Sequence, residues 1–193
     1  VYIISIEIFN VKLFFPLFII TSLYFVLGFV NIVFAFLALV CMFLPFILAY
    51  RDKKKTWCRR YCPRAGFLTI LGSKGIRLKS PKWLTSKNIR HGIIYYFAGN
   101  LFFIIMSTIM VSIGRIPPID KVRFLIFFQI PWDLPQLLSI IELPAIIIHL
   151  SFRLYSLMLT STVLGVFLAV IYQPRTWCAV CPINTLTGAV IKK

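Results

Sequence analysis

The longest apolar run in the chain extends from Leu13 to Tyr50 and contains no Asp, Glu, Lys, Arg or His. As one helix, its 38 residues would be about 57 Å long, nearly twice the ~30 Å hydrocarbon core of a bilayer. Gly28 and Asn31 interrupt the run near its middle. The pattern therefore predicts two membrane-spanning helices, at about residues 8–27 and 31–50, joined by a tight turn.

Two later apolar runs, at about residues 93–113 and 150–172, are each long enough for one more crossing. Residues 51–90 are polar and predict a loop, with a helical turn at its surface near residues 66–71. Residues 114–149 hold short apolar pieces separated by prolines, which is typical of an interfacial loop on the opposite side. The whole chain is thus expected to be one all-α, polytopic membrane domain with four transmembrane helices.

The composition supports a membrane protein. Hydrophobic residues make up 60% of the chain and charged residues 13%, whereas ordinary soluble domains have about 45–50% and 25%. Residues 1–10 lack the basic start and the cleavage pattern of a secretory signal peptide. The apolar helices themselves are therefore expected to direct the chain to the bilayer.

The charge is strongly basic and unevenly distributed. Of the 21 Lys and Arg residues, thirteen lie in residues 51–90 beside a single acid, Asp52, which gives this segment a net charge of +12. Residues 114–149 carry three basic and three acidic residues. Basic loops beside apolar spans stay in the cytoplasm, so this loop and both termini are predicted to lie on the cytoplasmic side of a prokaryotic-type inner membrane. Contact with anionic lipid or an acidic partner is the alternative, and no nucleic-acid-binding pattern is present.

A short motif occurs twice, each time after a predicted pair of spans. Residues 56–63 read TWCRRYCP and residues 176–182 read TWCAVCP, so each copy has Thr-Trp-Cys, a short gap and Cys-Pro. Four of the five cysteines belong to this repeat: Cys58, Cys62, Cys178 and Cys181. We therefore expect two pseudo-repeated hairpins that bring both cysteine pairs to the same edge of the membrane.

Four thiolates from two halves can hold a metal group. Within each pair, the cysteines are four or three residues apart, which places both on one face of a helical turn. Ligation by four cysteines suits a [4Fe–4S] cluster or a structural zinc ion, and a proline after the last cysteine recurs in cluster motifs. A thiol–disulfide couple is the third interpretation of the same cysteines.

The layout resembles the membrane iron–sulfur proteins of the NapH and NosR type. The resemblance is carried by Trp57, Cys58, Cys62, Pro63, Trp177, Cys178, Cys181 and Pro182. It implies a [4Fe–4S] cluster at the cytoplasmic membrane edge, with the four cysteines as ligands. It also implies electron transfer between the quinone pool or redox partners and further centres, so a quinone is a second expected ligand.

The sequence departs from that family in two places. The second motif is Cys-x2-Cys where the first is Cys-x3-Cys, and only twelve residues follow Cys181, without a soluble ferredoxin module. The next electron carrier is therefore expected to be another polypeptide: a subunit of a membrane redox complex, or a ferredoxin- or flavoprotein-like carrier. Arg59, Arg60 and Arg64 flank the first pair and are candidates for docking such an acidic carrier. The chain has no general acid–base pair or phosphate loop, so a non-catalytic electron-transfer subunit is expected.

Two alternatives use the cysteines differently. A quinone-linked thiol–disulfide oxidoreductase of the DsbB type also has four helices and two cysteine pairs, but it places them on the oxidising outer face. A non-redox assembly subunit with a structural metal is the other. The fifth cysteine, Cys41, is expected to pack in mid-span without a partner. His91 and His149 are predicted at opposite membrane edges and so cannot share a haem iron; His149 is either a packing residue or a neighbour of a quinone head group.

Overall fold

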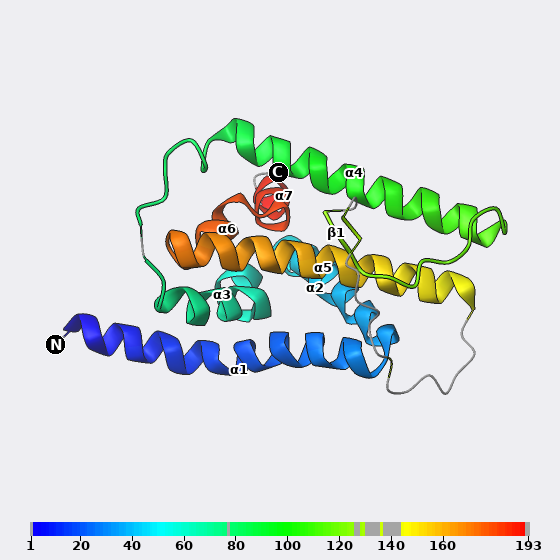
Figure 1. The fold of residues 1–193 in the computed structure, drawn as a ribbon. Coiled ribbons are helices and arrows are strands. Elements are labelled where there is room, and N and C mark those ends of the chain that lie inside the picture. Colours follow the sequence, from blue (N-terminus) through cyan, green and yellow to red (C-terminus); the bar gives the residue numbers. More distant parts are fainter. Residues whose placement is uncertain (1, 77, 126–127, 130–135, 137–143, 192–193) are drawn as a thin grey trace. The chain divides into compact units, whose positions relative to one another are not determined.

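The computed structural model describes residues 2–76, 78–125, 128–129, 136 and 144–191, with side chains from residue 15 onward except that of Arg59. This part of the chain is mostly helical, as predicted (Figure 1). Its helices are α1 (Tyr2–Val30), the 3-10 helix η1 (Ile32–Phe36), α2 (Leu37–Asp52), the π-helix η2 (Trp57–Tyr61), α3 (Pro63–Ser73), α4 (Lys87–Ser112), α5 (Ala145–Ile171), α6 (Thr176–Val180) and α7 (Pro182–Ile191). Two short strands, β1 (Arg123–Phe124) and β2 (Phe128–Gln129), pair antiparallel, and strands of two residues are too short to leave a sequence pattern.

The break in the long apolar run falls at Asn31, within the predicted turn. α1 continues to Val30, and Asn31 then adopts an extended backbone with φ −155° and ψ 128°. Its side-chain oxygen accepts a hydrogen bond from the Val33 N–H at 2.9 Å, which caps the first turn of η1. A short polar side chain thus starts the next helix where the two apolar segments separate.

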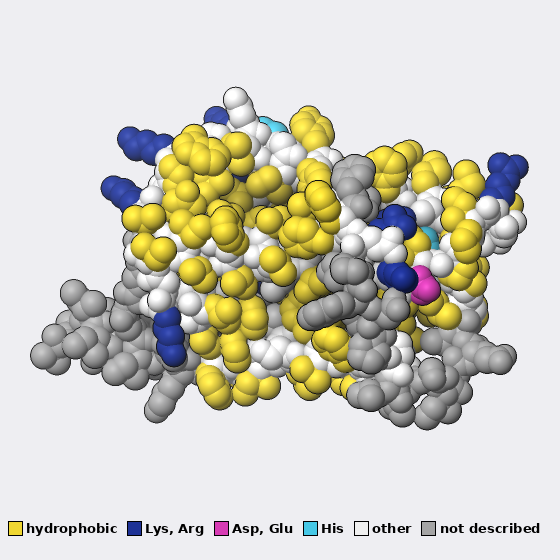
Figure 2. All heavy atoms as spheres, viewed as in Figure 1, with side chains coloured by type: hydrophobic (Ala, Val, Ile, Leu, Met, Phe, Trp, Pro, Cys, Tyr) yellow, Lys and Arg dark blue, Asp and Glu magenta, His cyan; other side chains and the backbone are white. Residues whose placement is uncertain are grey.

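Three helical segments are long and apolar enough to cross a membrane: residues 32–52, 87–112 and 145–171. They correspond to the second, third and fourth predicted spans. Among the described side chains, α1 contributes only a shorter apolar stretch, Phe15–Val30, so a four-helix count is not confirmed. Apolar side chains on these helices are widely exposed, and they cover much of the face in Figure 2. An exposed apolar surface of this extent suits a lipid environment.

The contacts within the chain divide it into two compact units. Unit 1 consists of residues 1–23, 41–93 and 162–193, and unit 2 consists of residues 24–40 and 94–161. The long helices contribute to both units, so the units do not follow one another along the sequence. A single membrane domain remains a prediction, and both cysteine motifs belong to unit 1.

The core of unit 1 joins α3, the C-terminal end of α5, and α6. Leu68, Ala169, Trp177 and Val180 are buried there in one hydrophobic cluster. Figure 1 shows the chain turning back after α5 into α6 and α7, drawn in red. This turn brings the second cysteine motif against the helix that follows the first.

α3 is longer and more buried than the surface turn predicted for residues 66–71. It contains eleven residues, and Leu68 has no exposed surface. Beyond its end, the Ile76 N–H donates to the Val170 carbonyl at 2.8 Å, and a Cβ on Gly75 would collide with that oxygen. The glycines that suggest a loop in the sequence instead allow the chain to approach α5 closely.

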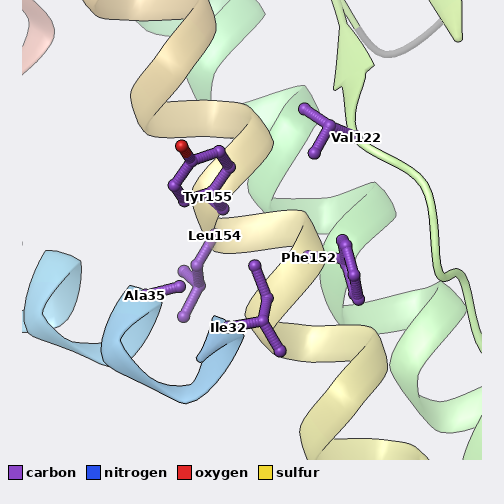
Figure 3. Packing of buried hydrophobic residues seen from close by; sticks show 6 residues of the cluster. All are labelled: Ile32, Ala35, Val122, Phe152, Leu154 and Tyr155. Atoms are coloured by element: carbon purple, nitrogen blue, oxygen red, sulfur yellow. The ribbon is translucent and has the colours of Figure 1, made fainter. Parts of the chain in front are cut away.

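The core of unit 2 forms around α5. Figure 3 shows its buried side chains: Ile32, Ala35, Val122, Phe152, Leu154 and Tyr155. The ring of Tyr155 lies edge to face with Phe25, with centroids 5.9 Å apart, and a Cβ on Gly28 would collide with the Tyr155 ring. Gly28 is therefore a packing site inside α1 rather than the point where the helix breaks.

Polar side chains along one face of α5 hold the segment that contains β1. Three backbone N–H groups donate to them: Ile119 to His149 Nδ1 (3.2 Å), Arg123 to Ser156 Oγ (3.0 Å) and Leu125 to Thr160 Oγ1 (3.3 Å). The three acceptors are seven and four residues apart, which is the spacing of one helix face. Irregular backbone in apolar surroundings needs such partners, so these buried polar residues are structural.

Candidate functional site

The two cysteine motifs adopt the same local structure. In each, a five-residue helix (η2 or α6) carries the first cysteine, the second cysteine is extended, and a longer helix (α3 or α7) starts at the following proline. The backbone angles agree: φ −68° and ψ 110° at Cys62, φ −55° and ψ 129° at Cys181. A residue before proline avoids the helical region, and proline favours the first helical position. The Cys-Pro step itself therefore sets this turn.

A π-helical turn absorbs the extra residue of the first motif. η2 closes with a hydrogen bond of 2.9 Å from the Cys62 N–H to the Trp57 carbonyl, five residues back. α6 in the second motif is an ordinary α-helix. A π turn is wider than an α turn, so Cys-x3-Cys and Cys-x2-Cys both lead into an equivalent Cys-Pro step.

The motif cysteines lie close enough together to affect one another's ionisation. Burial raises the pKa of Cys58 to about 11, and Cys62 and Cys181 act in the same direction, against the positive charge of Lys55. The sulfurs of all four motif cysteines are free thiols on half-buried residues. The influence of Cys181 on Cys58 links one motif to the other.

The same coupling extends to the remaining cysteines. Burial raises the pKa of Cys178 to about 12, with further contributions from Cys62 and Cys181. Burial also raises the pKa of Cys62, while the Arg64 guanidinium and the N–H groups at the start of α3 oppose the shift. The thiols of Cys58, Cys62 and Cys178 thus stay protonated at neutral pH until a cation replaces the protons.

The structure adds residues that the sequence analysis did not identify. Lys55 Nζ donates to the Asn184 carbonyl at 3.1 Å, and the Asn184 amide donates to the Cys178 carbonyl at 2.8 Å. The hydroxyl of Thr187, which is 2% exposed, lies beside Cys58 and lowers its pKa slightly against the larger effect of burial. Asn184 and Thr187 are three residues apart on α7, and two polar residues at that spacing beside a cysteine motif were the signal available in the sequence.

Trp177 places an unused donor beside the second motif. Its side chain is buried in the cluster against which Cys181 packs. Its indole N–H has no hydrogen-bond partner among the described residues. Indole is a donor only, so this N–H is suited to an acceptor that the described part of the chain does not supply.

The donor set fits a group that takes four thiolate ligands. Each of the two matching turns supplies two thiols, and the Arg64 charge reaches Cys62 and Cys178. In the part of the chain that the structure describes, no three His, Cys, Asp or Glu side chains are arranged to hold a metal ion. The residue types therefore suit such a group, whereas their arrangement in the described residues does not form a metal site.

The other predicted residues have different surroundings. Arg60 is exposed and Arg64 is half-buried, while the side chain of Arg59 lies outside the described residues. Cys41 in α2 is a free, half-buried cysteine that lies within electrostatic range of Cys62 and Cys181. The reason is that α3 packs back against the apolar helices, as the stacked rings of Phe18 and Phe67 (5.1 Å between centroids) illustrate.

The two histidines lie in separate environments. His149 has no exposed surface, its Nδ1 accepts from Ile119, and its Nε2 lies 3.0 Å from the Ser107 hydroxyl. Because both ring nitrogens are engaged, His149 is a packing residue rather than the neighbour of a quinone. His91 on α4 is exposed.

Comparison with known proteins adds no relative. No protein-family model, no curated protein and no solved structure matches this chain. The resemblance to membrane iron–sulfur proteins therefore rests on the order of apolar runs and the two motifs in this sequence.

Proposed function

We propose that this chain is an electron-transfer subunit of a membrane redox complex, in which Cys58, Cys62, Cys178 and Cys181 hold one [4Fe–4S] cluster. It passes electrons between partner redox proteins or the quinone pool and catalyses no reaction of its own. The observation that carries the proposal is the gathering of four half-buried thiols by two matching Cys-Pro turns in unit 1.

When bound, a [4Fe–4S] cluster takes up and releases one electron. The chain's own residues hold the ligands and control their surroundings. The thiols of the two motifs lose their protons as they become ligands. Buried Leu68 and Trp177 keep water away from the second motif, and the positive charge of Arg64 offsets part of the negative charge of four thiolates.

The proposal includes four crossings, with α1 as the first, and both motifs at the cytoplasmic edge. The net charge of +12 in residues 51–90 supports this orientation. Arg60 is exposed on η2 and is therefore accessible to an acidic ferredoxin- or flavoprotein-like carrier. In this arrangement, the electrons leave through a separate polypeptide that docks on the basic segment.

Two other functions use the same cysteines. A thiol–disulfide oxidoreductase needs a reactive thiolate with a lowered pKa, whereas burial raises the pKa of Cys58, Cys62 and Cys178. A structural zinc site would use the same ligands without sulfide or a redox signal. The electron-transfer role is therefore preferred to the first, and metal analysis separates it from the second.

The test is metal analysis of the chain purified in detergent without oxygen. We expect about four iron and four sulfide per chain, with an EPR signal after chemical reduction. If the protein contained one zinc ion and no sulfide, the cysteines would form a structural metal site instead of holding a cluster. Disulfides in a metal-free protein would favour the oxidoreductase, and free thiols without any metal would contradict the proposal.

The orientation is tested with single cysteines at exposed positions, Lys82→Cys in the basic segment and Arg115→Cys after α4. In intact cells, an impermeant thiol reagent should label Arg115→Cys, while Lys82→Cys should react only after the membrane is opened. The chain without a new cysteine measures the background from its own buried thiols. Labelling of Lys82→Cys from outside would place the cysteine motifs on the outer face and restore the oxidoreductase.

A further inference from the structure

Unit 1 contains a basic cavity beside the second cysteine motif. Its volume is about 540 Å³, and it lies among the segment after α2, the start of α4 and one face of α7. Its polar lining consists of Lys54, Lys55, Arg90, Asn184 and Thr185. No Asp or Glu is among the described residues that line it, so three cations face one space without a compensating acid.

Donors in this cavity have capacity for a ligand. Arg90 Nε is buried and has no hydrogen-bond partner among the described residues. The Lys55 ammonium has three donors, and the Asn184 carbonyl at 3.1 Å takes one of them. The Lys55 ammonium lies over α7 at Gly188, where an added Cβ would be 2.8 Å from Nζ.

We propose that this cavity binds a phosphate-bearing anion, supplied by the head group of an anionic phospholipid. An arginine with two lysines is a donor set that suits phosphate oxygens. The volume falls in the range of about 300–1,000 Å³ for small-molecule sites, so it holds a phosphate with its organic substituent rather than a bare ion alone.

The position of the cavity favours a lipid over a soluble phosphate compound. Arg90 belongs to the first turns of α4, a candidate membrane span, so the cavity lies at the edge of the apolar region. Basic pockets at such edges bind lipid head groups. None of the described lining residues is aromatic, so the cavity offers no surface on which a nucleobase would stack. This inference is independent of whether the cysteines hold a cluster.

The first test uses the unmodified protein in detergent with added phosphatidylglycerol, phosphatidylcholine or inorganic phosphate. We expect phosphatidylglycerol to raise the unfolding temperature and to remain bound in native mass spectrometry, while phosphatidylcholine does neither. Stabilisation by inorganic phosphate as large as that by phosphatidylglycerol would contradict the lipid as the source and assign the site to a free phosphate. Equal retention of both lipids, with no effect of phosphate, would overturn the site itself.

The second test removes one cavity charge at a time. Arg90→Gln and Lys55→Gln should each weaken phosphatidylglycerol binding by about tenfold, because each removes a charge-assisted hydrogen bond. Lys82→Gln is the matched control, since it removes the same charge from an exposed side chain outside the cavity. If all three variants lost the same amount of phosphatidylglycerol binding, the overall charge of the protein would explain the effect, and the cavity would not be the site. The lipid comparison on the unmodified protein holds even where a variant does not fold.

Discussion

The polar groups of the two units are used in opposite ways. In unit 2, His149, Ser156 and Thr160 on α5 each accept a hydrogen bond from a backbone N–H of the segment that contains β1. In unit 1, the motif thiols are brought next to one another, where each ionised thiol makes it harder for its neighbours to ionise. These three side chains of unit 2 therefore find their partners within the chain, whereas unit 1 brings together thiols whose ionisation a bound cation would favour.

This difference separates structural polar residues from functional ones. A buried polar side chain that pairs with backbone costs little and fixes the fold. Three of the motif thiols, those of Cys58, Cys62 and Cys178, have raised pKa values, and the indole N–H of Trp177 in the second motif has no partner among the described residues. We infer that the chain keeps these groups together for a ligand that completes the site.

The largest effect should come from removing one thiol of either motif. Cys58→Ala and Cys178→Ala should each abolish the EPR signal of the reduced protein, because a cluster that loses one of four thiolate ligands is labile. Cys41→Ala should leave the signal unchanged, although Cys41 lies within electrostatic range of Cys62. A full signal in either motif variant would show that one half of the repeat is sufficient.

The metal-free protein should be slow to react with alkylating reagents. With the pKa of Cys58 raised from 9.0 to about 11, its thiolate fraction at pH 8 is roughly a hundredfold lower than that of an ordinary thiol. Mass spectrometry of the alkylated protein, with urea-unfolded protein as the control, gives the ratio of rates. Equal rates in folded and unfolded protein would contradict the burial of the motif.

The same pKa shift has a consequence for stability. The folded state keeps the Cys58 proton more tightly than the unfolded state, so this contribution to stability is complete below pH 9 and is lost as the pH rises through about 11. The unfolding temperature of the metal-free protein should therefore fall between these values, and fall less in Cys58→Ala. A steeper fall of the unfolding temperature in Cys58→Ala would mean that burial does not raise the pKa of Cys58.

In unit 2, His149→Ala should destabilise the protein without affecting the metal. The substitution leaves the Ile119 N–H without its acceptor, at a cost of about 1–3 kcal/mol. His91→Ala, on an exposed side chain, is the matched control and should be near neutral. Unfolding temperature and iron content measure the two effects, and loss of iron in His149→Ala would give this residue a role in the site.

In unit 1, Gly75→Ala should weaken the seating of α3 against α5. A Cβ there would collide with the backbone of Val170, and overpacking of this kind costs about 1–3 kcal/mol. Gly92→Ala meets nothing within 4 Å and should be neutral or stabilising by up to about 1 kcal/mol. A lower unfolding temperature for Gly75→Ala only is expected; equal effects would mean that the close approach is not maintained.

The smallest effect should come from the exposed arginine beside the first motif. Arg60→Gln should slow reoxidation by an acidic carrier about twofold to fivefold at low salt, and the difference should vanish at high salt, as for other exposed charges. Arg64→Gln should also shift the reduction potential, because its charge reaches Cys62 and Cys178. If only Arg60→Gln shifted the reduction potential, then Arg60 rather than Arg64 would be the residue that acts on the cluster.

Much of the helical layout can be predicted from the sequence. Apolar length locates the three candidate spans to within six residues, because the boundary between lipid and water acts on each helix separately. The prediction of a surface turn near residues 66–71 is wrong. Gly72 and Gly75 are typical of a loop, but here they let α3 and the segment after it pack closely against α5. The break assigned to the region of Gly28 and Asn31 is made by Asn31 alone.

By itself, the sequence determined the apolar helices, the basic segment and the two Cys-Pro turns, since each depends on residues that are neighbours along the chain. Only the tertiary structure decided that Cys58 and Cys181 influence each other across the two motifs, that Cys41 lies within their range, and that Lys55 and Arg90 share one cavity. These relations join residues that are not neighbours along the chain, and hydrophobic periodicity specifies which face of a helix is buried but not which distant residue it meets. The partner is chosen by side-chain shape at the contact, as Gly75 and Gly188 illustrate, where the missing Cβ sets how closely two segments approach.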